Sequence, residues 1–464
     1  MVLGLRRKVL GGVYAAAALS VLAGCSDDPY APPTFPFLAS YKAAQNSAPV
    51  LLDNAEWWRQ FNDPTLNALV EKGLSGNLSL DLAKERVVEA RAVQRAVPQS
   101  AVLTPGAGVR RERLDDGPTR TRSEAGLNFD WILDIYGARR AQVEAAGARV
   151  EVAEAERDAA RLLMLLNISN AYVDLRYHQN SLQLRQSELR SRRQTLSLIE
   201  GLFEGDAATR VDVVRARALV SETRAGLPEI EASIAAARNE LAVLLGEVPG
   251  RATVALDGKA RQPRVSLSPE VGIPADLLRN RPDIRVAERS YYAALRDVKS
   301  ASADLYPRLS LSGMIGLTSL SGDRNTDYFF GPALRLPVLP DTSARANVEL
   351  RDSRARQAHT SWRLTVLGAI RDVETSLVEY SASLAAMRAS ENTVRLYREV
   401  VDLTREIASG DGATIRDLIE AEQNGSIANT ALAANLRRVG LNFIALNVSL
   451  GSGNRVGEAR AELR

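Results

Sequence analysis

Two periodicities of hydrophobic positions alternate along the chain, and together they predict long helices interrupted by short strands. Residues 137–203 and 343–408 contain no proline and are dominated by helix-forming residues, so each segment predicts one long helix. At 1.5 Å per residue, a helix of this length reaches about 100 Å. Return helices are expected over 207–246 and 413–449, and Pro228 should kink the first of them because it lacks a backbone N–H.

Four segments change to a period of two residues, which predicts β-strands. The expected strands are 101–113, 123–134, 308–318 and 328–338. In the second of them, five successive odd positions are apolar, whereas most even positions are polar or glycine. Each segment has the length and alternation of a transmembrane β-strand, although two soluble hairpins with one buried face are the alternative. The aromatic residues at or near the expected strand ends are Phe129, Trp131, Tyr136, Tyr306, Tyr328 and Phe329.

The same organisation occurs twice along the chain. Around two glycine-aspartate turns, five residues recur at a fixed offset of 205 positions. The pairs are Gly205 and Gly410, Asp206 and Asp411, Ala208 and Ala413, Thr209 and Thr414, and Asp212 and Asp417. A repeat of about 200 residues is too long for a solenoid, so we expect a duplicated protomer.

The duplication sets the expected domain boundaries. The first repeat opens on a helix that Asp63 can cap and Pro64 can start, and this helix runs towards Ser100. Prolines punctuate the segments before and between the repeats, which predicts extended connections there. The expected division is a signal peptide at 1–24, a lipidated tether at 25–56, a first repeat at 57–246, a connector at 247–275, a second repeat at 276–453 and a tail at 454–464.

The N-terminus has the features of an export signal. Three basic residues at 6–8 precede an apolar core at 9–22, and small residues follow. Leu-Ala-Gly-Cys25 resembles the lipobox of bacterial lipoproteins, which implies cleavage before Cys25 and its acylation, including palmitate. Cys25 is the only cysteine, and an ordinary signal peptide is the alternative. Ser26 resembles the residue found in lipoproteins sent to the outer membrane.

Composition and charge argue against several classes of function. The net charge of +3 gives no general basic field for nucleic acid. His178 and His359 are the only histidines, and both lie in expected helices. The sequence contains no phosphate-binding glycine loop, no zinc-protease motif and no nucleophile elbow. We therefore expect no enzyme activity, no catalytic residues, no cofactor and no metal site.

The strand count predicts an oligomer. Lipid does not tolerate an open sheet edge, because each unpaired backbone group costs several kcal/mol there. Four strands cannot close a barrel alone, whereas two chains would give eight strands and three would give twelve. An eight-stranded barrel is filled by its own side chains, so a conduit favours the trimer. The predicted fold class is mainly α with a transmembrane β part.

Three motifs together resemble one family. They are Trp57-Trp58-Arg-Gln-Phe61-Asn-Asp63-Pro64-Thr-Leu66, Asp130-Trp131-Ile-Leu133-Asp134-Ile-Tyr136-Gly137, and Leu277-Leu278-Arg-Asn-Arg281-Pro282-Asp283-Ile284 leading into Tyr306-Pro307-Arg-Leu309-Ser-Leu311-Ser-Gly313. They resemble the TolC-like outer-membrane factors over about 50–453. The resemblance implies a homotrimer with a twelve-stranded β-barrel in the outer membrane of a Gram-negative bacterium. A long α-helical barrel in the periplasm would meet an adaptor and an inner-membrane pump, of the resistance-nodulation-division type.

The resemblance also implies a gate at the periplasmic tip. The family closes this tip with a ring of carboxylates, and Asp417 and Glu420 occupy the two acidic positions. Their spacing of three residues puts both side chains on one helical face. Thr414 and Asp417 also fit a capping-box pattern, so a purely capping role for Asp417 stays open. Glu420 has no such alternative.

The two turns themselves have a structural and a binding interpretation. Glycines at 201, 205, 410 and 412 most simply supply turn conformations. Contact with an adaptor is implied by resemblance for Gly205, Asp206, Thr209, Asp212, Gly410, Asp411 and Thr414. Some relatives lock the tip with a tyrosine and an arginine, where this chain has Ala408 and Ala413. Arg416 or Arg210 could substitute by pairing with a neighbouring carboxylate.

The sequence therefore predicts a passive duct that exports small molecules from the periplasm, with drugs, metals and other cargo left open. A lipid-anchored periplasmic coiled-coil scaffold or adaptor is the alternative from another class. A duct for protein secretion is the alternative within the same class.

Overall fold

The chain divides into two compact units, and each unit takes segments from both repeats. Unit 1 consists of Met1–Phe35, Arg86–Glu154 and Val286–Leu364, and unit 2 consists of Pro36–Glu85, Ala155–Arg285 and Thr365–Arg464. The computed structural model describes residues 33–36, 56–98, 101–113, 119–250, 256, 261–265, 280–320, 323–337, 342–408 and 415–453.

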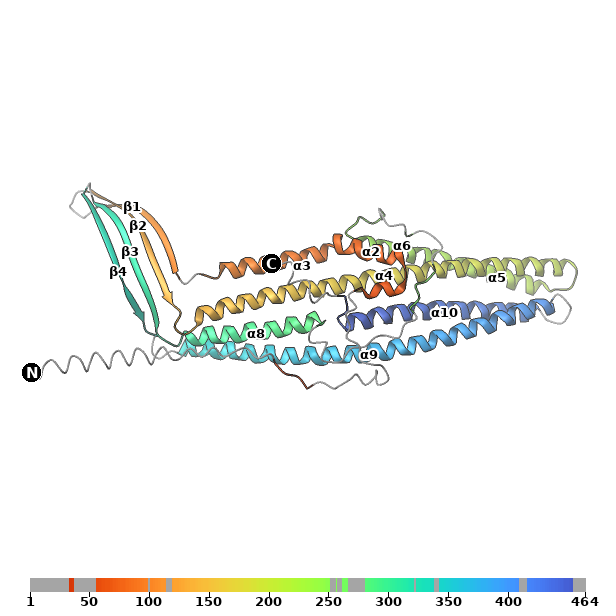
Figure 1. The fold of residues 1–464 in the computed structure, drawn as a ribbon. Helices are drawn as coiled ribbons and strands as arrows, with labels where there is room; N and C mark the ends of the chain where they lie inside the picture. Colours follow the sequence, from red (N-terminus) through yellow and green to blue (C-terminus); the bar gives the residue numbers. More distant parts are fainter. Residues whose placement is uncertain are drawn as a thin grey trace, which may run out of the picture. The chain divides into compact units, whose positions relative to one another are not determined.

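Unit 1 contains a four-stranded antiparallel sheet (Figure 1). Its strands are β1 (Ala101–Arg113), β2 (Thr119–Leu133), β3 (Arg308–Leu320) and β4 (Asp323–Arg335). The order in the sheet is β1-β2-β3-β4, so each repeat supplies one hairpin and β2 pairs with β3 across the duplication. The two outer strands, β1 and β4, each leave one edge without a partner strand in this sheet.

Three of the four strands have bounds that differ from the sequence-based expectation. Strand β2 begins at residue 119 rather than 123, and β3 ends at 320 rather than 318. Strand β4 covers 323–335 rather than 328–338, because Leu320 pairs with Asp323 and leaves only a two-residue connection. Polar residues therefore extend each hairpin beyond its apolar part. Consequently, Tyr328 and Phe329 lie inside β4 rather than at its start.

The register gathers apolar side chains on one face of the sheet. Leu103 is opposite Phe129, which is in turn opposite Gly313, and Gly313 is opposite Phe330. The rings of Phe129 and Phe330 stack at 6.4 Å across the strand between them. A Cβ atom on Gly313 would approach the Phe330 ring to 2.8 Å, so the missing side chain permits this stack.

The opposite face of the sheet carries most of the polar side chains, and Met314 and Phe329 are two apolar exceptions on it. The Ser312 hydroxyl donates to Asp130 at 3.3 Å, and the Thr318 hydroxyl donates to Asp327 at 2.9 Å. These residues alternate with the apolar positions along the same strands. The sheet thus has one face suited to lipid and one suited to water, as the period of two predicted.

The helices run largely as expected, and Figure 1 labels them. The long helices predicted at 137–203 and 343–408 correspond to α4 and α9 within one residue at each end. The elements are η3 (Trp57–Phe61), α2 (Pro64–Gly76), α3 (Leu78–Ala96), α4 (Ala138–Glu204), α5 (Arg210–Ala225), α6 (Leu227–Leu244), α8 (Pro282–Ala303), α9 (Thr342–Ala408) and α10 (Ile415–Ser449). Within the described ranges, none of these helices is long and apolar enough to cross a membrane.

Two expected helices are each interrupted once. The helix predicted from Asp63 towards Ser100 breaks at Asn77, which separates α2 from α3. The first return helix breaks at Gly226, two residues before Pro228. Because Pro228 lacks an N–H, the carbonyl four residues earlier has no helical donor, and the chain turns there as predicted.

The junction between β2 and α4 is closed by local hydrogen bonds in unit 1. Both carboxylate oxygens of Asp134 accept backbone N–H groups, from Arg139 at 3.0 Å and Arg140 at 2.8 Å. Gly137 adopts a φ of 72°, which suits glycine because this region crowds a side chain. These contacts explain the Asp-x-Tyr-Gly motif as the corner that turns a strand into a helix.

Unit 2 contains the aromatic residues of the N-terminal motif in its core. Trp57, Trp58 and Phe61 are buried, and Phe61 packs edge-on against Phe443 of α10 at 5.4 Å. Asp63 caps α2 through the N–H groups of residues 65 and 66, and its second oxygen accepts the Tyr172 hydroxyl at 2.6 Å. The motif therefore ties the start of α2 to α4 and α10.

The duplication is most visible at two joints in unit 2, where a return helix ends beside the start of another helix. Gly246 (φ 73°) follows the end of α6 by two residues, and Gly451 (φ 75°), which lies 205 residues later, follows the end of α10 by two residues. Each glycine closes the same pair of C-terminal hydrogen bonds. A Cβ atom would lie 2.2 Å from the Gly76 carbonyl oxygen in the first joint and 2.7 Å from Asn280 in the second.

The two joints use different side chains for one task. In the first, the Asn77 amide donates to the Leu244 carbonyl at 2.7 Å. In the second, the Arg281 guanidinium donates to the Ser449 carbonyl at 3.0 Å. Leu244 and Ser449 are also separated by 205 residues, so the accepting carbonyls are equivalent in the two repeats.

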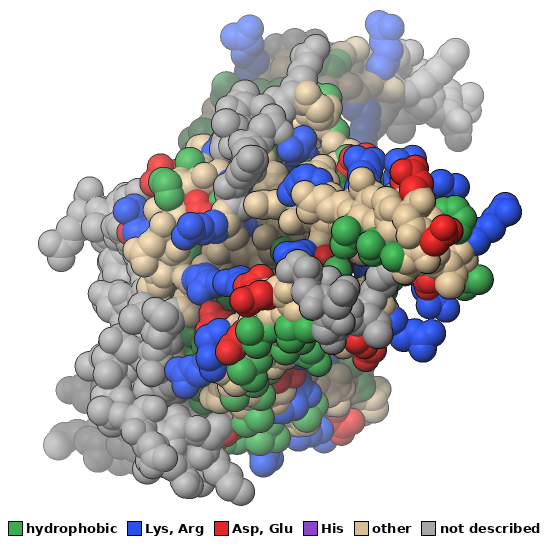
Figure 2. Space-filling model, turned by 90° about the vertical axis from the view of Figure 1, so that its right-hand side faces the viewer, with side chains coloured by type: hydrophobic (Ala, Val, Ile, Leu, Met, Phe, Trp, Pro, Cys, Tyr) green, Lys and Arg blue, Asp and Glu red, His purple; other side chains and the backbone are tan. Residues whose placement is uncertain are grey.

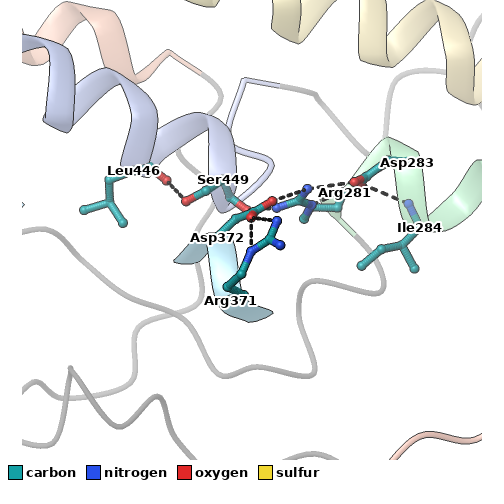
Figure 3. A network of polar contacts seen from close by, with 7 residues as sticks. All are labelled: Arg281, Asp283, Ile284, Arg371, Asp372, Leu446 and Ser449. Atoms are coloured by element: carbon teal, nitrogen blue, oxygen red, sulfur yellow. Dashed lines mark hydrogen bonds and ion pairs between the residues drawn. The ribbon is translucent and has the colours of Figure 1, made fainter. Parts of the chain in front are cut away.

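Arg281 is the centre of a larger network in the second joint (Figure 3). Its guanidinium binds both oxygens of Asp283, at 3.0 and 2.7 Å, and reaches Asp372 of α9 at 3.4 Å. Burial lowers the pKa of Arg281, but the hydrogen bonds and charges of these two aspartates outweigh it and raise that pKa. The network connects α8, α9 and α10 at one point.

We expect Arg281→Ala to lower the free energy of unfolding by about 2 kcal/mol, because three charge-assisted hydrogen bonds are lost at a largely buried position. The control is Arg371→Ala, which removes a mostly exposed guanidinium from the same Asp372 and should cost about 0.5 kcal/mol or less. Urea unfolding of the detergent-solubilised protein, followed by helical circular dichroism, checks both values. Equal losses would contradict a special role for Arg281.

Candidate functional site

The candidate site lies in unit 2, where two helical hairpins end. Helices α4 and α5 form one hairpin, and α9 and α10 form the other (Figure 1). Figure 2 views the protein from the side on which these hairpins end. On this face, Lys and Arg side chains are interspersed with Asp, Glu and hydrophobic side chains, and neither sign of charge dominates. We call the hairpin end, formed by residues 199–213 and 415–422, the tip.

The α4–α5 turn is built by a left-handed aspartate rather than by a glycine. Asp206 has a φ of 55°, whereas Gly201 and Gly205 are not among the described residues with positive φ. The N–H groups of Ala207 and Asp206 close back onto the carbonyls of Leu202 (2.7 Å) and Phe203 (3.1 Å). The expectation that these glycines supply the turn conformation is therefore wrong here. Aspartate is one of the few residues with a side chain that visits this conformation readily.

Thr209 and Asp212 form the capping box that their spacing predicted. The Asp212 N–H donates to the Thr209 hydroxyl oxygen at 3.3 Å, and the Asp212 carboxylate accepts the Thr209 N–H at 3.1 Å. The Thr209 hydroxyl itself donates to that carboxylate at 2.6 Å. This hydroxyl bond, and then the backbone bond, hold the pKa of Asp212 below its ordinary value.

Asp417 and Glu420 lie in the first turns of α10, and both side chains are exposed. The helix is oriented by its other face, on which Leu418 and Ala421 are buried. The pair can therefore present two carboxylates to solvent from one helix. The turn residues Gly410, Asp411 and Thr414, together with Ala413, lie outside the described residues, as does Cys25.

The two arginines considered as substitutes for a lock differ in position. Arg416 lies near enough to Asp212 that its charge contributes to lowering the pKa of that carboxyl. Arg210 makes no ion pair with another residue in the described parts of the chain.

An apolar cluster joins the two hairpins at the tip. Ile199 of α4 packs with Val213 and Ala216 of α5, and all three are buried. Ile419 of α10 packs against this cluster from the second hairpin. The two repeats therefore meet through hydrophobic contact one residue away from Glu420.

The sequence analysis missed a buried carboxylate near this cluster, that of Glu422, which follows Ile419 by three residues on α10. The side chain of Glu422 on α10 is 7% exposed. It accepts hydrogen bonds from Ser191 (2.9 Å) and Thr195 (3.0 Å) of α4 and from Arg405 (2.7 Å) of α9. Arg405 also donates to the Ser191 hydroxyl at 3.1 Å. We call these four residues the Glu422 network.

The sequence contained a signal for this network. Glu422 follows Leu418 by four residues, so an acidic residue falls within the stripe that α10 buries. A carboxylate in such a stripe needs donors, because burying an unpaired charge is costly. Ser191 and Thr195, which are four residues apart, present two hydroxyls on one face of α4.

The chemistry available at the tip is electrostatic. No group of three or more His, Cys, Asp or Glu residues is placed to hold a metal ion within the described segments. The exposed carboxylates can attract cations and repel anions, and the Glu422 network can hold three helices together.

The profile of the Outer membrane efflux protein family matches residues 69–247 and 273–452. The chain is 34% identical over 453 residues to Nodulation protein T of Rhizobium leguminosarum bv. trifolii, and this match covers 95% of the chain and 97% of the relative. It is 27% identical over 434 residues to the pyoverdine export outer membrane protein OpmQ of Pseudomonas aeruginosa, covering 88% and 90% respectively.

The fold is also similar to solved structures. The outer-membrane channel OprN superposes with a TM-score of 0.85 at 29% identity, covering 92% of this chain and 99% of that one. A match over 92% of the chain includes residues from both repeats.

We expect Glu422→Gln to loosen the tip, because the charge that holds Arg405 and two hydroxyls is lost. Backbone amides over 400–425 should exchange hydrogen roughly tenfold faster, as a loss of about 1.4 kcal/mol predicts. The control is Glu399→Gln, at an exposed position of α9, which should leave exchange unchanged. Unchanged exchange in Glu422→Gln, measured by mass spectrometry, would show that the network does not hold the hairpins.

Proposed function

The chain belongs to the outer membrane efflux protein family, and on that premise we propose that it is the exit duct of a tripartite pump. Its partners would be a periplasmic adaptor and an inner-membrane pump of the resistance-nodulation-division type. As in the family, the duplicated protomer forms a trimer, with a twelve-stranded barrel in the outer membrane and a helical tunnel in the periplasm. The chain is thus an outer-membrane efflux channel.

The observation that carries this proposal is the sheet with two free edges. Strands β1 and β4 have no further partner in the sheet, and the register places most apolar side chains on one face. In lipid, such edges must be paired, and pairing β4 of one copy with β1 of the next closes the ring. The polar face then lines a water-filled lumen.

The proposed duct is passive and catalyses no reaction. The sequence contains no nucleotide-binding motif, so the energy for export must come from the inner-membrane partner. The name of one relative refers to pyoverdine export. We propose small molecules as the cargo and assign their selection to the pump rather than to the duct.

We propose Asp417 and Glu420 as the periplasmic gate. Both carboxylates are exposed on α10 beside the cluster that joins the hairpins. Threefold symmetry would bring six carboxylates towards the axis, where they would select cations and repel one another. The Glu422 network provides the opposing force within each protomer, and it would take the place of the tyrosine and arginine that this chain replaces by Ala408 and Ala413.

We propose the two turns as the surface that contacts the adaptor. In the first, Gly205, Asp206, Thr209 and Asp212 occupy an exposed turn that its own hydrogen bonds hold in shape. Gly410, Asp411 and Thr414 are their counterparts in the second repeat. Three copies would present six turns in an alternating ring.

We expect the double variant Asp417→Asn, Glu420→Gln to reduce the preference of the channel for cations by roughly half or more, because the charged ring is neutralised. Single-channel conductance and reversal potentials in planar bilayers measure this change. The control neutralises Glu222 and Glu231, two exposed glutamates of α5 and α6. Identical selectivity in both double variants would remove the two α10 residues from the gate, and absence of any conductance in the unmodified protein would favour the scaffold alternative.

We also propose acylation of Cys25. The variant Cys25→Ser should incorporate no palmitate and should lose membrane attachment by its N-terminus, because two or more acyl chains are needed for stable anchoring. Metabolic labelling with radioactive palmitate measures this. Labelling equal to that of the unmodified chain would refute the assignment.

A further inference from the structure

Residues 33–36, in the segment before the first repeat, are described, and Phe35 contacts a helix of unit 1. Phe35 meets Trp362 of α9 edge to face, with ring centroids 6.1 Å apart and planes at 81°. Thr34, its neighbour, is exposed, whereas Phe35 is half-buried. The Phe35 ring thus makes a defined contact with α9.

Trp362 belongs to a row of aromatic rings. His359 stacks on Trp362 at 5.8 Å with planes at 24°, and Tyr291 of α8 lies 5.1 Å from His359. Trp362 is 1% exposed, and its indole N–H finds no hydrogen-bond partner among the described residues. We call Tyr291, His359 and Trp362 the aromatic seat. Ring contact and burial, rather than hydrogen bonds to the indole, hold Phe35 against the seat.

We propose that the aromatic seat is the docking site for the chain's own lipid-bearing N-terminal segment, and that Phe35 fixes the length of the leash between the acyl anchor and the helical tunnel. This inference rests on the proposed acylation of Cys25. Its occupant is the chain itself, because Phe35 already lies on the seat. The seat would thereby give the connection between the acyl anchor and α9 a defined length.

The distance along α9 from the membrane side to the seat agrees with the length of chain between Cys25 and Phe35. Trp362 lies 20 residues after the start of α9 at Thr342, which is roughly 30 Å along the helix. The start of α9 follows β4 closely and marks the membrane side of unit 1. Ten residue steps join Cys25 to Phe35, and they reach at most about 33–36 Å when fully extended.

The composition of the leash favours this extended length. Pro29, Pro32 and Pro33 lie within it, and a polyproline conformation of ten steps covers about 31 Å. The segment from Cys25 to Phe35 would thus reach roughly 31 Å, and the distance along α9 from Thr342 to Trp362 is roughly 30 Å. The two lengths are nearly equal, so the segment would be almost fully extended. An anchored chain would thus hold its tunnel at one depth below the membrane and resist sliding or tilting.

A single spin label tests the seat itself. In the mature lipoprotein the Cys25 thiol is acylated, so Thr34→Cys adds the only free thiol. The label should be largely immobile in the otherwise unmodified chain and become mostly mobile when Phe35→Ala is added. The matched control adds Leu350→Ala, an exposed residue of α9 outside the seat. A label that is equally immobile with and without Phe35 would overturn the proposal.

A length series tests the leash. Deletion of Pro29–Pro32 leaves six steps, or at most about 20–22 Å, which is too short to reach the seat from the membrane. In the lipidated protein this deletion should release the label. Replacing the same four residues by Gly-Ser-Gly-Ser keeps ten steps and should leave the label immobile.

The same deletion in a form exported by an ordinary cleavable signal, so that it starts at Ser26 and lacks lipid, should also leave the label immobile. Palmitate labelling of the same samples separates the two ideas. If no palmitate is incorporated, the proposed acylation of Cys25 is wrong. The Phe35→Ala result still tests whether Phe35 docks on the aromatic seat. With palmitate present, an immobile label in the lipidated deletion variant would overturn the leash.

Discussion

A backbone amide or carbonyl without a partner cannot remain in lipid, and this constraint accounts for most of the architecture. The sheet has only four strands, two from each repeat, and its outer strands end in unpaired edges. Closure therefore requires other copies of the chain, and a trimer gives a lumen that side chains do not fill. The helices that follow β2 and β4 therefore have the same threefold arrangement and extend away from the membrane.

Duplication lets one chain supply two similar helical hairpins to the same tunnel, while the ends of these hairpins differ. The joints at Gly246 and Gly451 keep identical backbone geometry, yet an amide serves in one and a guanidinium in the other. The divergence continues at the tip. The α4–α5 hairpin ends in a self-contained capping box, whereas α10 carries two exposed carboxylates and the buried Glu422. The proposed gate therefore belongs to the second hairpin.

Much of this could be predicted from the sequence, because periodicity reports burial directly. Proline-free stretches gave α4 and α9 to within a residue, and alternation located all four strands. The start of β4 was misplaced because Asp323–Asp327 is polar, and polarity at a strand end looks like a loop. Asp206 could not be identified as the left-handed residue beside Gly205, since both residues tolerate that conformation. Glu422 was missed because its partners are distant in sequence and are brought together only by packing.

The two joint glycines also say something about how such a chain can change over time. At either position even a methyl group would collide with the backbone of the preceding helix boundary, at 2.2 and 2.7 Å. The side chains around them differ between the repeats, as Asn77 and Arg281 illustrate. Divergence between the two halves is therefore restricted at these two glycines, while the surrounding residues vary. The path of the backbone through each joint can thus stay the same in both repeats although different side chains support it.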